Sequence, residues 1–551
     1  MSRTRQLLPN VTDYSALPRS WRGDVVAGVT VGVIALPLAL AFGVASGLGA
    51  TAGLLTAIVA GFLAALFGGS NVQVSGPTGA MTVVLAPVAA EVGVSGVLLV
   101  TLMAGLVLVI AGVAKFGKYV RLLPWPLIEG FTLGIAAIIL LQQVPAALGV
   151  EPGNYENTAV RALVALGDIA SAQWQAIAIV AIVAAAMLLL PRLHRSAPAS
   201  LIGIAVATFI GRLFDWPLTK IGEITASIPL PGIPAIEWSS VPGLAGATFS
   251  IAALAAIESL LSARVADGMA DNEHHDPDRE LVGQGIANVG SALFGGMPAT
   301  GAIARSAVNV RAGARTRFSS ITHATLLLIV VLALGPLVSQ IPLAALAAVL
   351  MVTAFHMIEF GTMMGIVKST RGDAAVLIAT AIATVAFDLV VAVELGFVLA
   401  ALITLHSVAS ETRFERDDLS SVDIDVETEH KLLDEHVVAY QLDGSLFFGA
   451  AQRFLLELTE ISDVRYVVLR LGKLRLLDAT GARAIGDLVA RLEHRGITVL
   501  LACVKPEHDR LINQVTELER LDNDHRTVPT INDALDFIHG RAPTPTDRAV
   551  A

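Results

Sequence analysis

Charged residues and cysteine are both scarce in this sequence. Only 15% of its 551 residues are charged, whereas 54% are hydrophobic, and the mean hydropathy is +0.70. An ordinary soluble enzyme carries roughly a quarter charged residues, so that class of protein is excluded. The single cysteine, Cys503, rules out an internal disulfide and fits a cytosolic segment.

The charges that are present are distributed unevenly. Up to about Ser407 the chain is a series of apolar runs, and from Glu411 onward it reads as soluble sequence rich in Arg, Asp and Glu. The net charge of -10 owes much to this second part, so it says little about partners. We expect no nucleic-acid partner. The first apolar run, from Val25 to Ala45, is longer than the roughly 7–15 apolar residues of a cleaved signal peptide.

The apolar runs predict a polytopic α-helical membrane protein. A helix needs about 20 apolar residues to cross a bilayer. Full spans are expected at 25–46, 51–68, 93–114, 125–145, 173–190, 198–214, 247–268, 281–296, 318–338, 342–360, 373–390 and 391–408. Two half-helices, near 77–91 and 300–311, are too short to cross and bring the total to about 14 segments.

Lysine and arginine predict how these segments are oriented. They gather on the side that also holds the N-terminal arginines and the soluble part: Lys115, Lys118, Arg121, Arg192, Arg195, Arg279, Arg311, Arg315, Arg317, Lys368 and Arg371. The positive-inside rule then places both termini in the cytoplasm, with the protein in the inner or plasma membrane. We expect a cytoplasmic N-terminus at 1–23 and a transmembrane domain at 24–408.

Two short stretches interrupt the membrane part in the same way. Phe67-Gly68-Gly69 leads to Met81, Phe294-Gly295-Gly296 leads to Val308, and each passes through Pro and Thr into a short helix. A helix that begins in mid-membrane has N–H groups without intrahelical partners, and with the helix dipole these make a site for an anion. Matched breaks in two halves are typical of an inverted-repeat transporter. We predict two inverted seven-segment repeats whose half-helices face one another near the membrane midplane.

The predicted anion site lies between the starts of the two half-helices. Its N–H groups belong to residues near Thr78-Gly79-Ala80 and Gly301-Ala302-Ile303, and Ser75 and Thr300 are candidate hydroxyl donors. Val72 to Ser75 alternates like a short strand. These glycines could instead serve only close helix packing. The recurrence of the pattern in both halves favours the site.

Two ionisable residues in the membrane part are candidates for function. Arg305 lies about one turn inside the second half-helix, where its charge adds to the helix dipole. It could instead snorkel to the surface with Arg311. Glu258 lies in mid-span, where it could pair with Arg305, carry a coupling proton or coordinate sodium.

Other polar residues of the membrane part are weaker candidates. Arg264 and Asp267 follow Glu258 toward the cytoplasmic end, and we expect them to form a structural gate. His274 and His275 lie in one hydrophilic loop without metal-ligand spacing, so we expect no metal site. No nucleophile–base constellation or phosphate-cradling motif is present, so we expect neither an enzyme nor a cofactor.

Several motifs resemble the SulP family of anion transporters, which includes sulfate permeases, bicarbonate transporters and animal anion exchangers. They are Gly28–Gly32, Ile34–Gly43, Val74–Gly79, Ile257–Ser262, Ala266–Gly268 and the 294–306 stretch. The resemblance covers essentially the whole chain. It implies a core that bears both half-helices, a gate domain against which the core moves, and a homodimer.

Within the family, three segments are similar to the sodium-coupled bicarbonate branch: Ala41–Gly47, Pro77–Val84 and Lys115–Val120. That branch holds sodium with an aspartate at the position of Glu258 and a threonine at that of Ile303, and it has no arginine at Arg305. A hard cation prefers oxygen ligands. The departures disfavour sodium coupling. The Glu/Arg combination resembles the wider family, where anion–proton symport or anion exchange is typical.

The soluble part, 436–540, alternates β-rich runs with helix-like segments at 450–461 and 481–494, and it resembles the α/β STAS domain. In Asp478-Ala479-Thr480-Gly481, alanine stands where related proteins have a phosphorylated serine, so phosphoregulation there looks absent, although Thr480 keeps a hydroxyl. A linker is expected at 409–435 and a disordered tail at 541–551. A cytoplasmic partner of the STAS domain is a further expectation.

The sequence thus predicts a secondary active transporter of a small inorganic anion of the sulfate or bicarbonate class. The preferred modes are proton-coupled symport or anion exchange by movement of the core against the gate. A sodium-coupled bicarbonate symporter and a passive anion channel are the alternatives, and a regulatory membrane scaffold is a further class. Glu258 favours the transporter, because a channel needs no protonatable partner.

Overall fold

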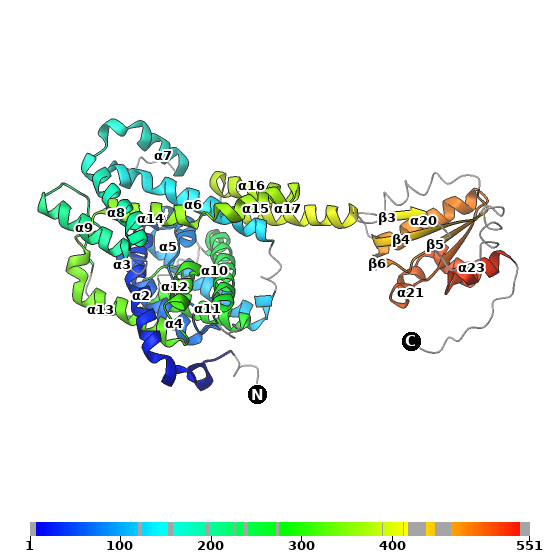
Figure 1. The fold of residues 1–551 in the computed structure, drawn as a ribbon, viewed down its shortest axis with the longest axis horizontal. Coiled ribbons are helices and arrows are strands. Elements are labelled where there is room, and N and C mark those ends of the chain that lie inside the picture. Colours follow the sequence, from blue (N-terminus) through cyan, green and yellow to red (C-terminus); the bar gives the residue numbers. More distant parts are fainter. Residues whose placement is uncertain are drawn as a thin grey trace. The chain divides into compact units, whose positions relative to one another are not determined.

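The computed structural model consists of two compact units, Met1–Val398 and Leu399–Ala551 (Figure 1). It describes residues 7–118, 124–151, 158–193, 198–224, 227–234, 241–270, 275–387, 389–410, 413–416, 437–446 and 464–539. Among these, eight helices are long and apolar enough, by length and composition, to cross a membrane. The predicted tail at 541–551 and the predicted helix at 450–461 lie outside the described residues.

The first unit is built from helices. In chain order they are η1 (Val11–Tyr14), α2 (Leu17–Ala45), α3 (Ala50–Leu55), the π-helical turn η2 (Thr56–Ala60), α4 (Gly61–Phe67), α5 (Gly79–Val113), α6 (Trp125–Leu148), α7 (Thr158–Gly167), η4 (Ile169–Ser171), α8 (Trp174–Leu193), α9 (Ala199–Leu213), α10 (Val241–Met269), α11 (Pro277–Leu293), α12 (Ile303–Arg311), α13 (Phe318–Val338), α14 (Leu343–Met357), α15 (Phe360–Ser369), α16 (Arg371–Ala386) and α17 (Leu389–Ser410). Two short strands, β1 (Ser75–Gly76) and β2 (Thr300–Gly301), precede α5 and α12.

The element order repeats as the sequence predicted. In the first half, α2 and the broken helix α3–η2–α4 are followed by β1 and by α5, which contains a half-helix and a full span separated at Gly93 (φ +69°). In the second half, α10 and α11 are followed by β2, the half-helix α12 and the span α13. The chain then returns through α6, α8 and α9 in one half and through α14, α16 and α17 in the other.

Two α-helices of the described part of the first unit were not predicted. α7 lies in the loop expected at 146–171, and α15 follows the span expected to end near residue 360. Each has only 10 residues, which is too short for the hydropathy signal of a span. In α7, Ala162 and Ala165 are buried while Leu163 and Leu166 are exposed, so its packing face is made of small residues.

Helix contacts divide the membrane unit into two groups. The core group consists of α2, α3, η2, α4, α5 and α10 to α13, and the gate group of α6, α8, α9, α14 and α16. The helix α17 also belongs to the gate group, because a Cβ atom at Gly396 would overlap Leu127 of α6 and Thr380 of α16. The groups meet where α2 packs against α9 and α14, and where α5 packs against α6.

Glycine permits the closest packing within the core group. A Cβ atom at Gly105 of α5 would lie 2.8 Å from the carbonyl oxygen of Gly285 in α11. The reverse also holds, since a Cβ atom at Gly285 would lie 2.6 Å from the carbonyl oxygen of Gly105. The two backbones therefore touch, as small residues allow in membrane helices, and α11 is fixed beside the full span of α5 that follows Gly93.

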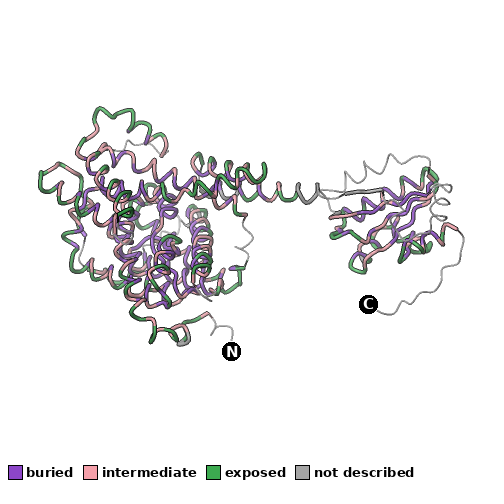
Figure 2. Tube along the Cα trace, in the orientation of Figure 1, coloured by how far each residue is buried: buried purple, intermediate pink, exposed green. Residues whose placement is uncertain are grey.

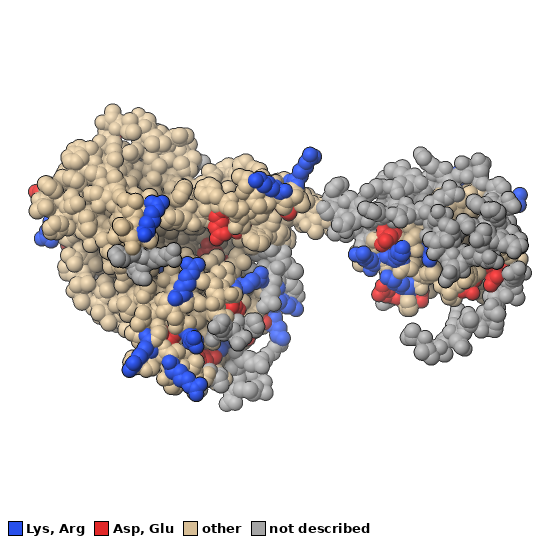
Figure 3. Space-filling model, viewed as in Figure 1, with Lys and Arg blue, Asp and Glu red and all other residues tan. Residues whose placement is uncertain are grey.

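The surface of the first unit has the features of a membrane protein. Its interior is buried and its periphery exposed (Figure 2), and large apolar side chains such as Ile110 and Phe209 are exposed. Trp216 packs against Trp174 and Phe214, with ring centroids 5.1 and 6.0 Å away, a cluster typical of a membrane–water interface. On the face shown in Figure 3, Lys and Arg gather toward the N-terminal end and leave the region of α7 largely free of charge.

The second unit is a sheet covered by helices. Its strands are β3 (Arg413–Arg416), β4 (Val437–Leu446), β5 (Tyr466–Arg470), β6 (Leu474–Leu477), β7 (Thr498–Ala502) and β8 (Thr527–Val528). Its helices are α20 (Ala479–His494), α21 (Pro506–Ile512), α22 (Thr516–Asn523) and α23 (Ile531–Ile538). The strand order is β3-β4-β5-β7-β8, with β3 antiparallel to β4 and the other neighbours parallel; β6 pairs with the end of β4.

Alternation along the strands determines which helix covers which face of this sheet. Val467 and Leu469 of β5 pack with α20, whereas Val468 packs with α23. Part of the predicted linker, 409–435, is ordered, because α17 continues to Ser410 and β3 pairs with β4; the rest of it lies outside the described residues.

Candidate functional site

The two predicted helix breaks lie side by side. Strands β1 and β2 pair antiparallel, with Ser75 opposite Gly301 and Gly76 opposite Thr300. The backbone N–H of Ala302 extends the pairing by donating to the carbonyl oxygen of Val74 over 2.9 Å. Non-helical backbone inside a membrane must satisfy its polar groups within the protein, and here the two breaks satisfy each other. The half-helices of α5 and α12 start directly after this pair.

Helix α10 supports the second break through serine hydroxyls. Ser259 shares a hydrogen bond of 2.8 Å with Thr300 and accepts the backbone N–H of Gly301 over 3.0 Å. One turn later, Ser262 shares a bond of 3.0 Å with Ser306 of α12. The spacing of three residues puts both serines on one face of α10, so β2 and α12 are fixed to that face.

Helix α11 supports the first break through a chain of polar side chains. The amide nitrogen of Gln284 donates to Ser75 Oγ over 2.6 Å and to Glu280 Oε1 over 2.8 Å. The other oxygen of Glu280 accepts the backbone N–H groups of Gly69 and Ser70 over 2.7 and 3.2 Å. The hydroxyls of Ser75 and Thr300 are therefore buried against scaffold helices, and their role as ligand donors stays a prediction.

The starts of both half-helices lack a side-chain cap. Thr78 and Ala302 occupy the N-cap positions of α5 and α12, and neither side chain accepts a helix N–H. The hydroxyl of Thr78 donates instead to Glu258 Oε2 over 3.0 Å. Without a capping side chain, the first N–H groups of both helices keep the capacity to hold an anion.

Arg305 is buried beneath the first break. Its side chain is 4% exposed, and Nη2 donates to the carbonyl oxygen of Pro77 over 2.7 Å. The other terminal nitrogen, Nη1, has no partner among the described residues. A Cβ atom at Gly76 would lie 2.7 Å from Nη1, so the guanidinium can occupy this position only because residue 76 is glycine. Arg305 thus lies inside the protein, away from the snorkelling position considered from the sequence.

Glu258 and Arg305 interact without direct contact. Glu258 is half-buried on α10, and its only hydrogen-bond partner in the described part of the chain is Thr78. The two charges influence each other electrostatically, but no ion pair within 4.0 Å joins them among the described residues. Ile303 is 42% exposed at the start of α12 and brings no oxygen there.

Apolar side chains from both groups lie against the start of the α5 half-helix. A Cβ atom at Gly79 would overlap Ile139 of α6 and lie 3.3 Å from Cε1 of Phe42 in α2. Ile139 and Phe42 are both buried. The start of the half-helix therefore lies where the core group meets the gate group.

The structural gate expected of Arg264 and Asp267 stays a prediction, and the contacts of Asp267 are with His275. Asp267 accepts the Nδ1 and backbone N–H of His275 over 2.6 and 2.9 Å. Arg264 is exposed and takes part in no ion pair within the described residues. His275, predicted to lie in a solvated loop, is instead held against the end of α10, and His274 lies outside the described residues.

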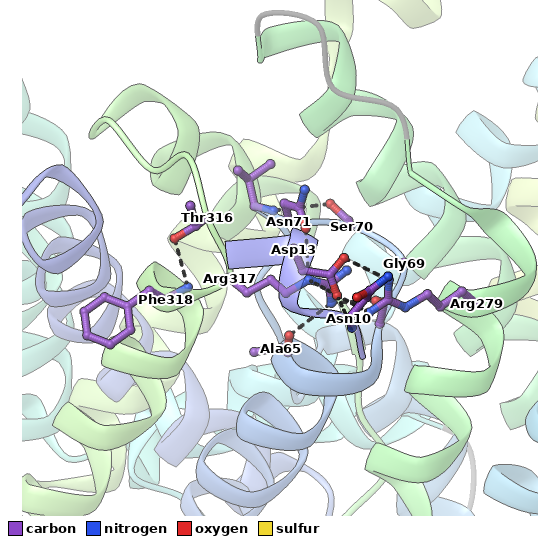
Figure 4. Close-up of polar contacts among 12 residues, drawn as sticks. Asn10, Asp13, Ala65, Gly69, Ser70, Asn71, Arg279, Thr316, Arg317 and Phe318 are labelled. Atoms are coloured by element: carbon purple, nitrogen blue, oxygen red, sulfur yellow. Dashed lines mark hydrogen bonds and ion pairs between the residues drawn. The ribbon is translucent and has the colours of Figure 1, made fainter. Parts of the chain in front are cut away.

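A second cluster of buried charges joins the N-terminal segment to the core group (Figure 4). Arg279 donates to both carboxylate oxygens of Asp13 over 2.6 and 3.2 Å, and Arg317 Nε lies 3.6 Å from the same carboxylate. Arg317 also donates to the carbonyl oxygens of Ala65 and Gly68 over 3.2 and 2.6 Å. Burial tends to raise the pKa of Asp13, but the bond from Arg279 and the two arginine charges hold its pKa below the ordinary value.

Sequence reasoning missed most of the supporting side chains. They are Ser259, Ser262 and Gln284, which hold the two breaks, and Asp13 and Arg317 of the second cluster, none of which was predicted to take a supporting part. A signal was available in part, because polar residues at spacings of three or four in a membrane span mark a face that contacts protein. Such spacing does not reveal which helix lies opposite.

Comparison with known proteins identifies the family. A model described as the sulfate permease family matches residues 21–380, and a STAS domain model matches residues 430–534. The chain belongs to the sulfate permease family. The SulP resemblance predicted from the motifs is confirmed, and the family consists of membrane transporters for anions such as sulfate and bicarbonate.

Relatives of both substrate classes are similar over most of their length. "Putative sulfate transporter YvdB" of Bacillus subtilis (strain 168) is 32% identical over 515 residues, which cover 92% of this chain and 96% of the relative. "Bicarbonate transporter BicA" of a Picosynechococcus species is 33% identical over 495 residues, which cover 86% of each chain.

Solved structures confirm the predicted fold class. The transmembrane domain of the cyanobacterial bicarbonate transporter BicA is 34% identical with a TM-score of 0.62 and covers 70% of this chain and 98% of that chain. Murine SLC26A9 in the inward-facing state gives a TM-score of 0.84 over 98% of this chain and 95% of that chain, at 17% identity. The latter likeness shows the fold alone.

Proposed function

We propose that this protein is a secondary active transporter of a small inorganic anion of the sulfate or bicarbonate class. The observation that carries the proposal is the pairing of β1 with β2, which brings two uncapped half-helix starts and a buried arginine together. Two helix dipoles and one fixed positive charge then act on the same small region.

The proposed anion site uses mainly backbone groups. The N–H groups near Thr78-Gly79-Ala80 and Gly301-Ala302-Ile303 hold the anion, and Arg305 contributes charge through its unpartnered Nη1. Ser75 and Thr300 take a supporting part, because their hydroxyls already bond to α11 and α10. Because the site has few side-chain donors, it selects anions by charge and size more than by shape.

Transport follows from movement of the core group against the gate group. Both breaks are fixed to α10 and α11, which belong to the core group, so the whole site moves with that group. Apolar contacts such as Gly79 with Ile139 line the boundary between the groups, and sliding there breaks no hydrogen bond that these residues make. We further propose a homodimer in the inner or plasma membrane with both termini in the cytoplasm, and a cytoplasmic partner for the STAS domain.

Glu258 is the proposed coupling residue, and the proton is the preferred ion. The hydrogen bond from Thr78 holds the carboxylate of Glu258 close to the site. The carboxylate also interacts electrostatically with Arg305, although the two form no ion pair among the described residues. An anion beside Arg305 would offset the positive charge that favours ionised Glu258, so anion and proton would load together. Sodium coupling is the alternative; the exposed hydrocarbon side chain of Ile303 argues against it.

Uptake into proteoliposomes tests this proposal. Purified full-length protein is reconstituted, and labelled sulfate and bicarbonate are offered under an imposed proton gradient, an imposed sodium gradient, or a counter-anion gradient. We expect saturable accumulation driven by protons or by exchange, and none in protein-free vesicles. Accumulation that follows only sodium would support the bicarbonate-symporter alternative. Unsaturable flux proportional to voltage would support a channel.

A further inference from the structure

One face of α13 is polar although the helix lies within the membrane unit. Ser319, Ser320 and His323 are buried on this face, at spacings of three and four residues. Ser320 Oγ donates to the carbonyl oxygen of Gln73 over 2.7 Å, and Ser319 Oγ accepts from Asn309 of α12 over 2.9 Å. The polar face of α13 is therefore directed at the first break and at the half-helix α12.

His323 differs from the two serines because its ring has no hydrogen bond. It is 0% exposed, and neither Nδ1 nor Nε2 has a partner among the described residues. The ring lies near β1, since the position of a Cβ atom at Gly61 would be 3.9 Å from His323 Cε1 and 3.2 Å from the carbonyl oxygen of Ser75. A neutral imidazole has one donor and one acceptor, and because most buried polar groups in proteins are hydrogen-bonded, an unpartnered buried ring calls for an explanation.

The charges around His323 are few. The helix α13 packs against α2, η2 and α4; η2 and α4 contain no ionisable residue, and α2 has only Arg19, Arg22 and Asp24 near its first turns. On α13 itself, the nearest charge is Arg317, which precedes the helix and is engaged with Asp13. The charge that acts on the ring is Arg305 of α12.

Arg305 therefore interacts with a protonatable group on two helices. Glu258 lies on α10 and His323 on α13, and both interact electrostatically with the same guanidinium. With Glu258 ionised and His323 neutral, the three side chains together carry no net charge. In a low-dielectric core, each negative charge that an anion adds favours the uptake of a proton.

We propose that His323 is a second protonatable residue of the transport cycle and takes up a proton when a divalent anion binds beside Arg305. This rests on the proposed function. A monovalent anion adds one negative charge, which protonation of Glu258 offsets. A divalent anion adds two, and His323 supplies the second base. Loading is then electroneutral with one proton for bicarbonate and two for sulfate. The same linkage makes protonation raise anion affinity.

The first experiment measures proton uptake directly. A pH-indicating dye follows weakly buffered, purified full-length protein as sulfate or bicarbonate is added. We expect uptake of about two protons per bound sulfate and one per bound bicarbonate. In His323→Gln the sulfate value falls by one and the bicarbonate value is unchanged, whereas Glu258→Gln lowers both. His356→Gln serves as the control, because His356 is exposed on α14.

The second experiment measures the gradient that protons sustain. At zero membrane potential, a tenfold proton gradient supports about a hundredfold sulfate gradient with two protons and about a tenfold one with a single proton. We expect His323→Gln to reduce the sulfate gradient from about a hundredfold to about tenfold. Thermal unfolding shows whether the variant is folded, and His323→Asn serves as a second variant. An equal number of protons per sulfate in the wild type and in a folded His323 variant overturns the inference. If the wild type transports neither sulfate nor bicarbonate, the proposed function is overturned instead. If sulfate binds to the wild type without any proton uptake, the role of His323 is overturned.

Discussion

Arg305, in the first turn of α12, donates to the carbonyl oxygen of Pro77 over 2.7 Å and so joins the second half-helix to the segment that leads into the first. The bond satisfies one terminal nitrogen and leaves the other without a partner in the described structure. The guanidinium thus has a structural contact on one side and a charge available for a ligand on the other. A substitution at this position tests both.

Arg305→Ala is expected to weaken anion affinity about tenfold to a hundredfold. A charge at close range contributes several kcal/mol before desolvation is subtracted, so the net loss is smaller. Arg305→Lys keeps the charge but cannot hold the same planar geometry, and it should lose less. Isothermal titration with sulfate and bicarbonate measures both. Unchanged affinity in a folded Arg305→Ala protein would leave Arg305 with only its bond to Pro77.

Glu258→Gln is expected to abolish proton-driven accumulation while leaving anion binding measurable. The amide oxygen can still accept the Thr78 hydroxyl, so the local hydrogen bond survives and only the titratable group is lost. Uptake into proteoliposomes under an imposed pH gradient is the measurement. Glu91→Gln is a matched control, since Glu91 is exposed at the far end of the half-helix of α5, away from Glu258 on α10. Accumulation that persists in Glu258→Gln would assign coupling to another group.

Gly79→Ala is expected to slow transport through contact between the core and gate groups. The added methyl group would overlap Ile139 of α6, and overpacking of this kind costs about 1–3 kcal/mol, roughly tenfold in rate. The double variant Gly79→Ala with Ile139→Ala should recover much of the loss. Gly268→Ala is the control, because open space surrounds that position. Equal rates for Gly79→Ala and Gly268→Ala would show that Ile139 does not restrict movement there.

Asp13→Asn is expected to lower the free energy of unfolding by about 1–3 kcal/mol, because Arg279 and Arg317 lose a charged acceptor. The pKa of Asp13 is lower in the folded protein than its ordinary value of 3.8, so its contribution is present above that pH and is lost as the pH falls below it. Thermal unfolding in detergent should show the gap between wild type and variant narrowing below pH 3.8. Glu223→Gln, an exposed position, should show no gap.

The half-helices were predictable because glycine and proline interrupt runs that are otherwise apolar, and Gly68, Gly69 and Pro77 mark one such interruption directly. The pairing of the two breaks was only partly predictable: Val72 to Ser75 alternates like a strand, but two residues of β2 are too few to give a pattern. The bond from Gln284 to Ser75 could not be predicted, because a polar residue in a span shows that a partner exists and not which one.

The pairing of β1 with β2 also bears on reversibility. Because the two breaks are bonded to each other, a ligand held between them would keep the same surrounding N–H groups at every position of the core group relative to the gate group. Its dissociation constant should then be nearly equal when measured from either side of the bilayer. The gradients of the anion and of its coupling ion would then decide the direction of net transport, and the protein would catalyse export as readily as import.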